Sequence, residues 1–239
     1  DGLPPRKLYH NCAGKHLALM LLQRALGAEV RDYWKPDAPA QEEVRRVILQ
    51  MSECGHTDLG IDGCGVPVFA VPLWGIAAAF LNLAAPERIP DPSLREAAVR
   101  FVPRMHRYPL MMRGTGYLCS LLNEDPNVVA KGGANGVYGF ALKKEKLGVA
   151  FKFTDGTEGS WALVILEVLR ALGCLSGIRG GVWRVYIHSS SATTTARWRV
   201  RAKPRSRFRS DKGAGRGGLA GKSGGIHAGA SRVAFMPPV

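Results

Sequence analysis

The chain has 239 residues, of which 46% are hydrophobic and 22% are charged, a composition typical of a soluble globular protein. No apolar run reaches the roughly 18 uninterrupted residues that a membrane-spanning helix needs, because prolines and Asn82 interrupt the longest candidate, residues 66–85. We therefore expect no membrane association. Five cysteines at scattered spacings do not suggest a disulfide framework, which favours reduced thiols and a cytoplasmic location.

The positive charge is concentrated at one end of the chain. The formal net charge is +14, and residues 176–239 hold 13 Lys and Arg against the single acid Asp211. This segment also contains serine and threonine runs, an Arg-rich stretch at 197–209 and many glycines, so it cannot bury enough apolar surface to fold. We predict a folded domain over residues 1–175 and a disordered basic tail over residues 176–239.

The first half of the domain shows helical spacing of apolar residues. Residues 15–26 and 40–51 are predicted helices, with Gly27 ending the first and Pro39 preceding the second. A tight turn at residues 62–65 leads into a strand at 66–71. Further helices are predicted at residues 74–83, 92–104 and 115–123.

Strands dominate the second half of the domain. Residues 128–130, 136–143 and 148–154 are predicted strands, and the last two form a hairpin candidate across the charged turn 144–147. A helix at residues 159–172 ends at Gly173. Helices mixed with antiparallel strands indicate an α+β or α/β sandwich rather than a helical bundle.

The segment HNCAGKH at residues 10–16 crowds polar, reactive side chains into the start of a predicted helix. A cysteine at a helix N-terminus tends toward the thiolate, which is a nucleophile and a soft metal ligand. Cys12 and Lys15 are three residues apart, so both side chains can face the same point. The alternative is a helix cap with a buried cysteine.

A second segment, IDGCGVP at residues 61–67, places Asp62 and Cys64 on a glycine-rich turn. The carboxylate of Asp62 is suited to hold the ammonium group of an amino acid, or simply to cap the turn. Cys12 and Cys64 are suited to share a zinc ion with Lys15 as a third ligand, since catalytic zinc typically keeps three protein ligands. The spacing of the two cysteines alone does not decide between these alternatives.

Two further motifs carry candidate residues. Lys131 precedes the turn GGANG at residues 132–136 and is a candidate general base or charge-stabilising group, the alternative being a solvated lysine. Thr115, in the segment RGTG at residues 113–116, is suited to bind a substrate amide, although its chemistry alone favours a helix cap.

Together these segments resemble the Rhizobium etli-type bacterial L-asparaginases. The resemblance is carried by HNCAGKH (10–16), IDGCGVPVFAVPL (61–73), MRGTG (112–116), AKGGANGVYGFAL (130–142) and the helix entry DGTEGSW (155–161). It covers most of residues 1–173, and the order and spacing of the segments also match. The pairing of the first two segments is specific.

This resemblance implies a serine-β-lactamase-like fold, with helices flanking an antiparallel sheet that is incomplete here, and hydrolysis of L-asparagine to L-aspartate and ammonia by a homodimer. It implies a metal site, with zinc as the expected ion, built from Cys12, Lys15 and Cys64. Asp62 would bind the amino acid head group, and His16 would lie beside it. Lys131 matches a family lysine that partners a catalytic serine.

The sequence also departs from the family pattern. The family's nucleophilic Ser-x-x-Lys motif precedes HNCAGKH, and no such motif occurs in residues 1–175. We therefore expect a fragment with little or no turnover. Ala13 stands where the family more often has Ser, and Asn135 stands where it more often has Glu. Loss of the acid at 135 alters the polar contacts that the family would have around Lys131. The sequence after Gly173 resembles a frameshifted or spliced ending.

Two other functions compete with this one. Cys12, paired with His10 or His16, is an alternative nucleophile. The Arg-rich tail, with Trp198 and Phe208 among its arginines, is an alternative nucleic-acid-binding segment through phosphate contacts and base stacking.

Overall fold

The computed structural model describes residues 4, 6–174 and 232–236. These residues divide into two compact units. The first comprises the described parts of Asp1–Gly133, Val137–Lys152 and Arg232–Val239, and the second those of Ala134–Gly136 and Phe153–Ser231. Every candidate residue that the structure describes lies in the first unit.

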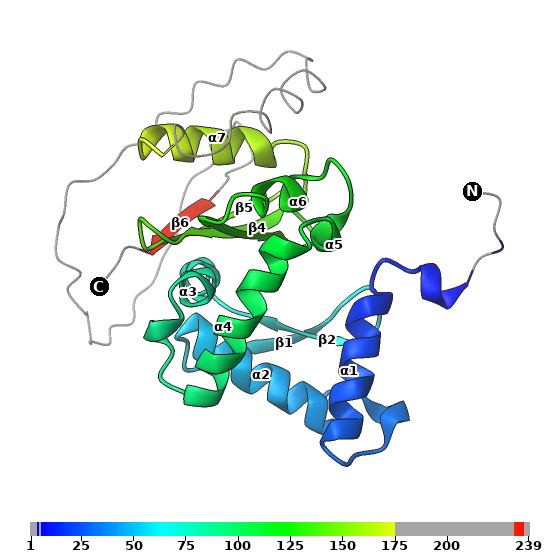
Figure 1. Cartoon of the computed structure of the whole chain (residues 1–239). Coiled ribbons are helices and arrows are strands. Elements are labelled where there is room, and N and C mark those ends of the chain that lie inside the picture. The colour runs from blue at the N-terminus through cyan, green and yellow to red at the C-terminus, as the bar shows by residue number, and fades with distance from the viewer. Residues whose placement is uncertain (1–3, 5, 175–231, 237–239) are drawn as a thin grey trace, which may run out of the picture. The chain divides into compact units, whose positions relative to one another are not determined.

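The first unit contains most of the helices and all of the described strands (Figure 1). Its helices are α1 (Ala13–Ala25), α2 (Pro39–Ser52), α3 (Leu73–Ala84), α4 (Pro92–Arg107), α5 (Leu110–Arg113) and α6 (Leu118–Leu122), with short 3-10 turns at Lys7–Tyr9, Val30–Asp32 and Pro86–Arg88. Its strands are β1 (Asp58–Ile61), β2 (Pro67–Ala70), β3 (Val128–Gly132), β4 (Val137–Leu142), β5 (Leu147–Lys152) and β6 (Arg232–Met236).

The strands form two antiparallel sheets. β1 and β2 pair with Ile61 opposite Pro67 at the end nearest their connecting turn. β3, β4, β5 and β6 form the second sheet in that order, and each neighbouring pair is antiparallel. Helices and antiparallel strands together confirm the predicted α+β class.

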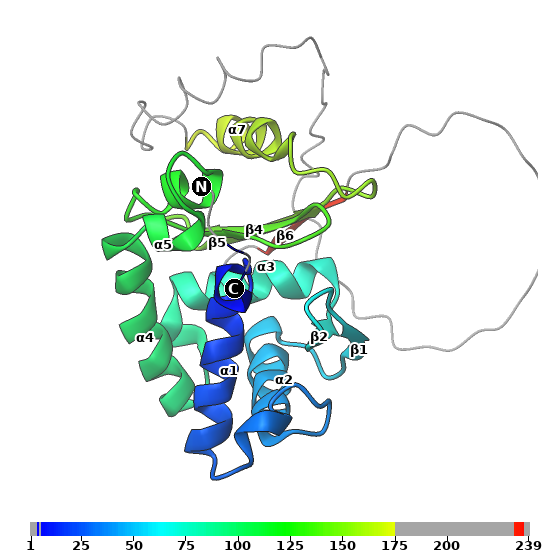
Figure 2. The ribbon, with the colours of Figure 1, turned by 90° about the vertical axis from the view of Figure 1, so that its right-hand side faces the viewer.

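Helix α3 packs on the four-stranded sheet, as Figures 1 and 2 show. Its residues Ala77, Ala78 and Leu81 are completely buried. The approach is close because the sheet presents glycines to the helix: a Cβ added at Gly139 would collide with the Phe80 ring, and one at Gly148 with the backbone oxygen of Ala77. The apolar segment predicted as a buried helix is therefore the centre of the core.

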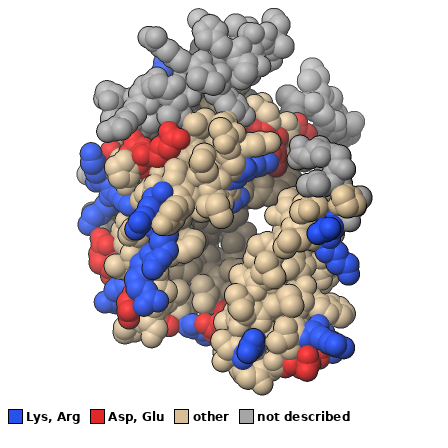
Figure 3. Space-filling model, turned by 45° about the vertical axis from the view of Figure 1, so that its right-hand side comes forward, with Lys and Arg blue, Asp and Glu red and all other residues tan. Residues whose placement is uncertain are grey.

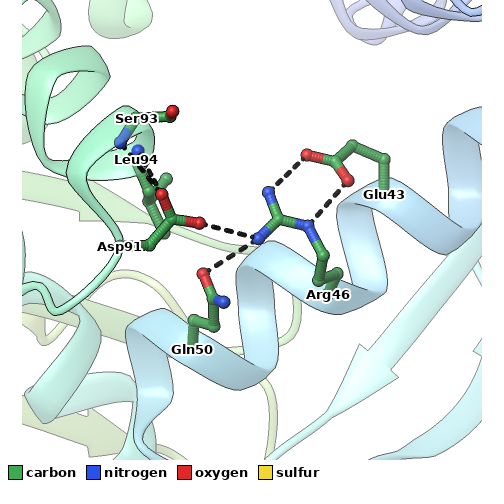
Figure 4. A network of polar contacts seen from close by, with 6 residues as sticks. All are labelled: Glu43, Arg46, Gln50, Asp91, Ser93 and Leu94. Carbon is green, nitrogen blue, oxygen red and sulfur yellow. Dashed lines mark hydrogen bonds and ion pairs between the residues drawn. The ribbon is translucent and has the colours of Figure 1, made fainter.

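A polar network joins α2 to the start of α4 (Figure 4). The Asp91 carboxylate accepts hydrogen bonds from the backbone N–H groups of Ser93 and Leu94, at 2.9 and 3.2 Å, and so caps α4. Its other oxygen accepts a hydrogen bond from Arg46 Nη1 at 3.0 Å. Arg46 also pairs with Glu43 at 2.7 Å, so one guanidinium links α2 to the residue that caps α4.

Uncharged residues, drawn in tan, border the central hollow in Figure 3. An apolar cavity of about 960 Å³ lies between α2, β2, α3 and α4. No helix among the described residues is long and apolar enough to cross a membrane.

The second unit consists of a turn and one helix in its described part. Gly136 has a φ of +75° and lies so close to Phe153 that a side chain at this position would collide with its backbone oxygen. The backbone N–H of Phe153 donates to Gly136 O at 3.0 Å. Helix α7 (Trp161–Ala171) follows and ends before Gly173, whose φ is +70°.

The predicted helices at 15–26, 40–51, 74–83 and 159–172 and the hairpin 136–154 are confirmed within a few residues. Three expectations need correction. Strand β1 was not predicted, because its residues form only a short, exposed run. The helix predicted from Thr115 begins at Leu118, and Tyr117 is its N-cap residue without a side-chain capping bond, so Thr115 does not cap it.

The third correction concerns the tail. Residues 232–236 form β6 and pair with β5, with Phe235 opposite Val149, so the prediction of disorder is wrong for these five residues. The edge of β5 that faces away from β4 offers backbone donors and acceptors, and β6 takes them up. The Arg-rich stretch 197–209 and the rest of 175–231 lie outside the described residues.

Candidate metal and substrate site

The start of α1 and the turn between β1 and β2 bring the two cysteine motifs together. The turn is closed by hydrogen bonds from Asp62 N to Val66 O at 2.9 Å and from Gly65 N to Asp62 O at 2.8 Å. Gly65 has a φ of +87°, a conformation that favours glycine. The glycines of IDGCG therefore shape the turn that presents Asp62 and Cys64.

Asp62 is the centre of the site. One of its carboxylate oxygens, Oδ2, accepts a hydrogen bond from Lys15 Nζ at 2.7 Å and another from Cys64 Sγ at 3.4 Å. The other oxygen accepts the backbone N–H of Gly63 at 2.8 Å. This carboxylate thus ties α1 to the β1–β2 turn across a long stretch of sequence.

Cys12 completes a cluster of potential metal ligands. The ligand atoms of Cys12, Asp62 and Cys64 all lie within 4.8 Å of one another, and all three residues are partly buried. Cys12 is also the N-cap residue of α1, but its side chain makes no capping hydrogen bond. Its thiol is therefore available to the cluster, and the helix-cap interpretation of this cysteine is not supported.

The charges in the cluster are set by their neighbours. Hydrogen bonds from Lys15 and then Cys64 hold the pKa of Asp62 below its ordinary value. Burial opposes the charge on Lys15, but its bonds to Asp62 and Cys64 outweigh burial and raise its pKa. Burial also raises the pKa of Cys12, and although Lys15 opposes this, Cys64 and Asp62 add to it.

Burial, the neighbouring thiol and the carboxylate of Asp62 thus oppose the thiolate character that was predicted for Cys12 from its place at a helix N-terminus. Lys15 likewise stays an ammonium rather than a neutral amine, because the carboxylate beside it stabilises its charge.

A cavity of about 610 Å³ opens beside the cluster, and Gly63, Cys64, His10 and His16 are among its lining residues. His16 Nδ1 lies 2.7 Å from the hydroxyl of Tyr33, with the two rings edge to face. His10 Nδ1 accepts a hydrogen bond from the backbone N–H of Cys12 at 3.1 Å. Both histidines thus line the cavity beside the cluster.

The other two candidates are not part of this cluster. Lys131 lies on β3, opposite Gly139, and its Nζ donates to the backbone oxygen of Gly132 at 2.6 Å. Thr115 is exposed in the loop between α5 and α6. Neither residue lines the cavity beside Cys64.

Sequence reasoning missed Tyr33. This tyrosine lines the cavity and orients the His16 ring, yet it lies in the irregular segment between α1 and α2, where no motif marks it. A buried glutamine pins that segment: Gln41 donates to the backbone oxygen of Tyr33 at 2.7 Å. The signal in the sequence was Gln41, a polar residue near the start of α2 that is buried and bonds the backbone of Tyr33.

A known protein family matches most of the chain. The model of the family described as L-asparaginase II matches residues 1–189 of the chain. The chain belongs to the L-asparaginase II family. No curated protein in the comparison matches the chain. Both cysteine segments, Lys131 and Thr115 lie within the matched part of this L-asparaginase II chain, whereas the Arg-rich stretch lies beyond it.

Proposed function

We propose that the chain forms the metal and substrate site of an L-asparaginase of the Rhizobium etli type, with zinc held by Cys12, Lys15 and Cys64. The observation that carries the proposal is the convergence of two distant segments on Asp62. L-asparaginase II family membership supplies the reaction, hydrolysis of L-asparagine to L-aspartate and ammonia.

The residues present fit a zinc ion. Two thiols and an amine combine the sulfur and nitrogen donors that zinc prefers, and they lie around one carboxylate. Zinc bound there would act as a Lewis acid. Each of these three donors must lose its proton to bind, which the raised pKa values of Cys12 and Lys15 oppose until a metal arrives.

Asp62 is the proposed substrate-binding residue. Its lowered pKa keeps it charged, and its neighbours Gly63 and Cys64 line a cavity large enough for an amino acid. A neutral, metal-bound Lys15 would no longer neutralise this carboxylate. The α-ammonium group of L-asparagine would then take the place of the lysine charge, with His16 and Tyr33 at the cavity wall.

Lys131 is the proposed proton acceptor for a serine nucleophile in the intact family member. Residues 1–175 contain no Ser-x-x-Lys motif, so we propose that this chain binds L-asparagine but releases little or no ammonia. We also propose that the intact family member is a homodimer and that the protein is cytoplasmic.

A binding experiment separates head-group recognition from turnover. L-asparagine and succinamate, which lacks the α-ammonium group, are titrated into the zinc-loaded chain by calorimetry or ligand-observed NMR. We expect L-asparagine to bind more tightly than succinamate, and the Asp62→Asn substitution to abolish that preference. Equal affinities for the two ligands in the unsubstituted chain would refute the role of Asp62. Ammonia release at rates typical of an intact enzyme would refute the predicted inactivity.

The two competing functions have less support. A Cys12 nucleophile needs an activated thiol, but the pKa of Cys12 is raised and His10 Nδ1 bonds the Cys12 backbone rather than its thiol. Nucleic-acid binding rests on residues 197–209 with Trp198 and Phe208, which lie outside the described residues.

A further inference from the structure

The outer edge of β3 is bonded by side chains of α6 and of its C-cap residue Asn123 rather than by another described strand. Within the described sheet, β3 is an edge strand whose only strand neighbour is β4. The side chain of Asn123 makes the hydrogen bonds that a neighbouring strand would make. Its Nδ2 donates to Ala130 O at 2.7 Å, and its Oδ1 accepts a hydrogen bond from the backbone N–H of Ala130 at 3.3 Å. One side-chain amide thus satisfies both backbone groups of the residue that precedes Lys131.

Helix α4 holds Asn123 through a histidine. His106 Nδ1 lies 3.1 Å from the backbone oxygen of Asn123. A carbonyl oxygen only accepts hydrogen bonds, so the proton of the neutral ring resides on Nδ1 and leaves Nε2 as an acceptor. The next contact confirms this arrangement, because Lys143 Nζ lies 2.8 Å from His106 Nε2 and an ammonium group can only donate.

The chain of contacts therefore runs from Lys143, which directly follows β4, through His106 on α4 to Asn123 and the edge of β3. We infer that His106 and Lys143 form a pH-responsive brace that holds Asn123 against the strand that carries Lys131. Protonation of His106 fills the lone pair on Nε2 and places two cations 2.8 Å apart, so acid breaks its contact with Lys143. The charged ring keeps its Nδ1–H donor to Asn123, and acid therefore acts on Asn123 by driving the ring away from Lys143.

Burial, and after it the charge of Lys143, favour the neutral form of His106. Burial lowers its pKa, the contact with Asn123 opposes this, Lys143 lowers it further, and Asp125 acts in the opposite direction. Asp125 is nearly buried and accepts the backbone N–H of Asn127 at 2.8 Å. Burial also lowers the pKa of Lys143. Because the pKa of His106 is lowered in the folded chain, the neutral ring contributes to the stability of the fold above pH 6.5. This contribution is lost as the pH falls through the lowered pKa.

The brace is tested in the full chain by hydrogen exchange of the Ala130 amide at about pH 5 and about pH 8, corrected for the intrinsic exchange rate. We expect protection at the higher pH and its loss at the lower. His106→Gln keeps a donor and an acceptor but does not titrate, so the pH response should disappear while protection persists. His56→Gln is the matched control, since His56 is exposed and pairs with Asp58 rather than with a lysine, and it should leave the response unchanged.

A second variant keeps the test decisive if His106→Gln fails to fold. Lys143→Met removes the facing cation but keeps an apolar stem, so the pKa of His106 measured by NMR should rise. An unchanged histidine pKa in Lys143→Met, or an unchanged pH response in His106→Gln, would overturn the brace. Neither readout depends on asparagine or zinc, so this inference stands or falls independently of the proposed function.

Discussion

The ammonium group of Lys15 lies 2.7 Å from the carboxylate of Asp62, and this ion pair joins the first helix to the turn between β1 and β2. Both side chains are partly exposed, at 41% and 31%. A pair this open contributes at most about 1 kcal/mol to stability. Its importance is therefore in what it positions, namely two cysteines on either side of one carboxylate.

Replacing Lys15 by Met should weaken zinc binding at least ~10-fold, because loss even of a residue that merely supports a metal ligand costs about that much. Competition with a chromogenic chelator measures the affinity. Lys35→Met is the matched control, since Lys35 forms a comparable surface pair with Asp32 at 2.9 Å. Equal zinc affinities for Lys15→Met and Lys35→Met would show that Lys15 is not a ligand.

Zinc affinity should rise with pH across the neutral range. Three donors must lose protons on binding, and the pKa values of Cys12 and Lys15 lie above their ordinary values. Calorimetry in buffers of different ionisation enthalpy counts the protons released. Affinity that stays constant between about pH 6 and about pH 8 would contradict this ligand set.

The Lys15–Asp62 pair has its own pH window in the metal-free chain. Because the pKa of Asp62 is lowered from 3.8, the charged carboxylate stabilises the folded chain at pH values above 3.8. This stabilisation is lost as the pH falls through the lowered pKa. Because the pKa of Lys15 is raised from 10.5, its ammonium group stabilises the folded chain at pH values below 10.5. This stabilisation is lost as the pH rises through the raised pKa. Urea unfolding of the chain and of Asp62→Asn should therefore differ between these limits and converge in acid.

Asp91 should show two separable roles. Asp91→Ala removes both the cap of α4 and the partner of Arg46, so it should lower the melting temperature. Asp91→Ser keeps an oxygen for the cap but removes the charge, and should lower the melting temperature less. Equal losses in the two variants would mean that the helix cap contributes nothing.

Gly148→Ala should destabilise the first unit by about 1–3 kcal/mol, the usual cost of overpacking a core, because the added carbon would collide with the backbone of Ala77. Urea unfolding measures the change. Gly55→Ala is the control, since nothing lies within 4 Å of the added carbon. Equal stability of the two variants would contradict the claim that α3 packs too closely on the sheet to admit a side chain at position 148.

Periodicity predicted the helices well where an apolar stripe meets a defined stop, as in α1, which ends just before Gly27 at a φ of +74°. It could not predict β6, because the hydrogen bonds that hold Arg232–Met236 come from β5, far away in sequence. The motifs predicted the members of the cluster, but not that Asp62 would pair with Lys15. That contact depends on where the β1–β2 turn lies relative to α1.

The contacts between His106, Asn123 and Lys143 could not be predicted from the sequence either. His106, Asn123 and Lys143 belong to three different elements, and no spacing in the sequence links them. Their relationship appears only once α4, α6 and the end of β4 are packed together. Local sequence thus predicts elements and reactive residues, whereas long-range packing decides which of them touch.

The central claim is tested most directly by counting the zinc that the purified chain retains after dialysis. We predict one zinc ion per chain, lost in Cys12→Ser and in Cys64→Ser but kept in Cys54→Ser, whose thiol instead donates to Ser52 O. A chain that retains no zinc, or that keeps it when both Cys12 and Cys64 are replaced, would contradict the proposed site.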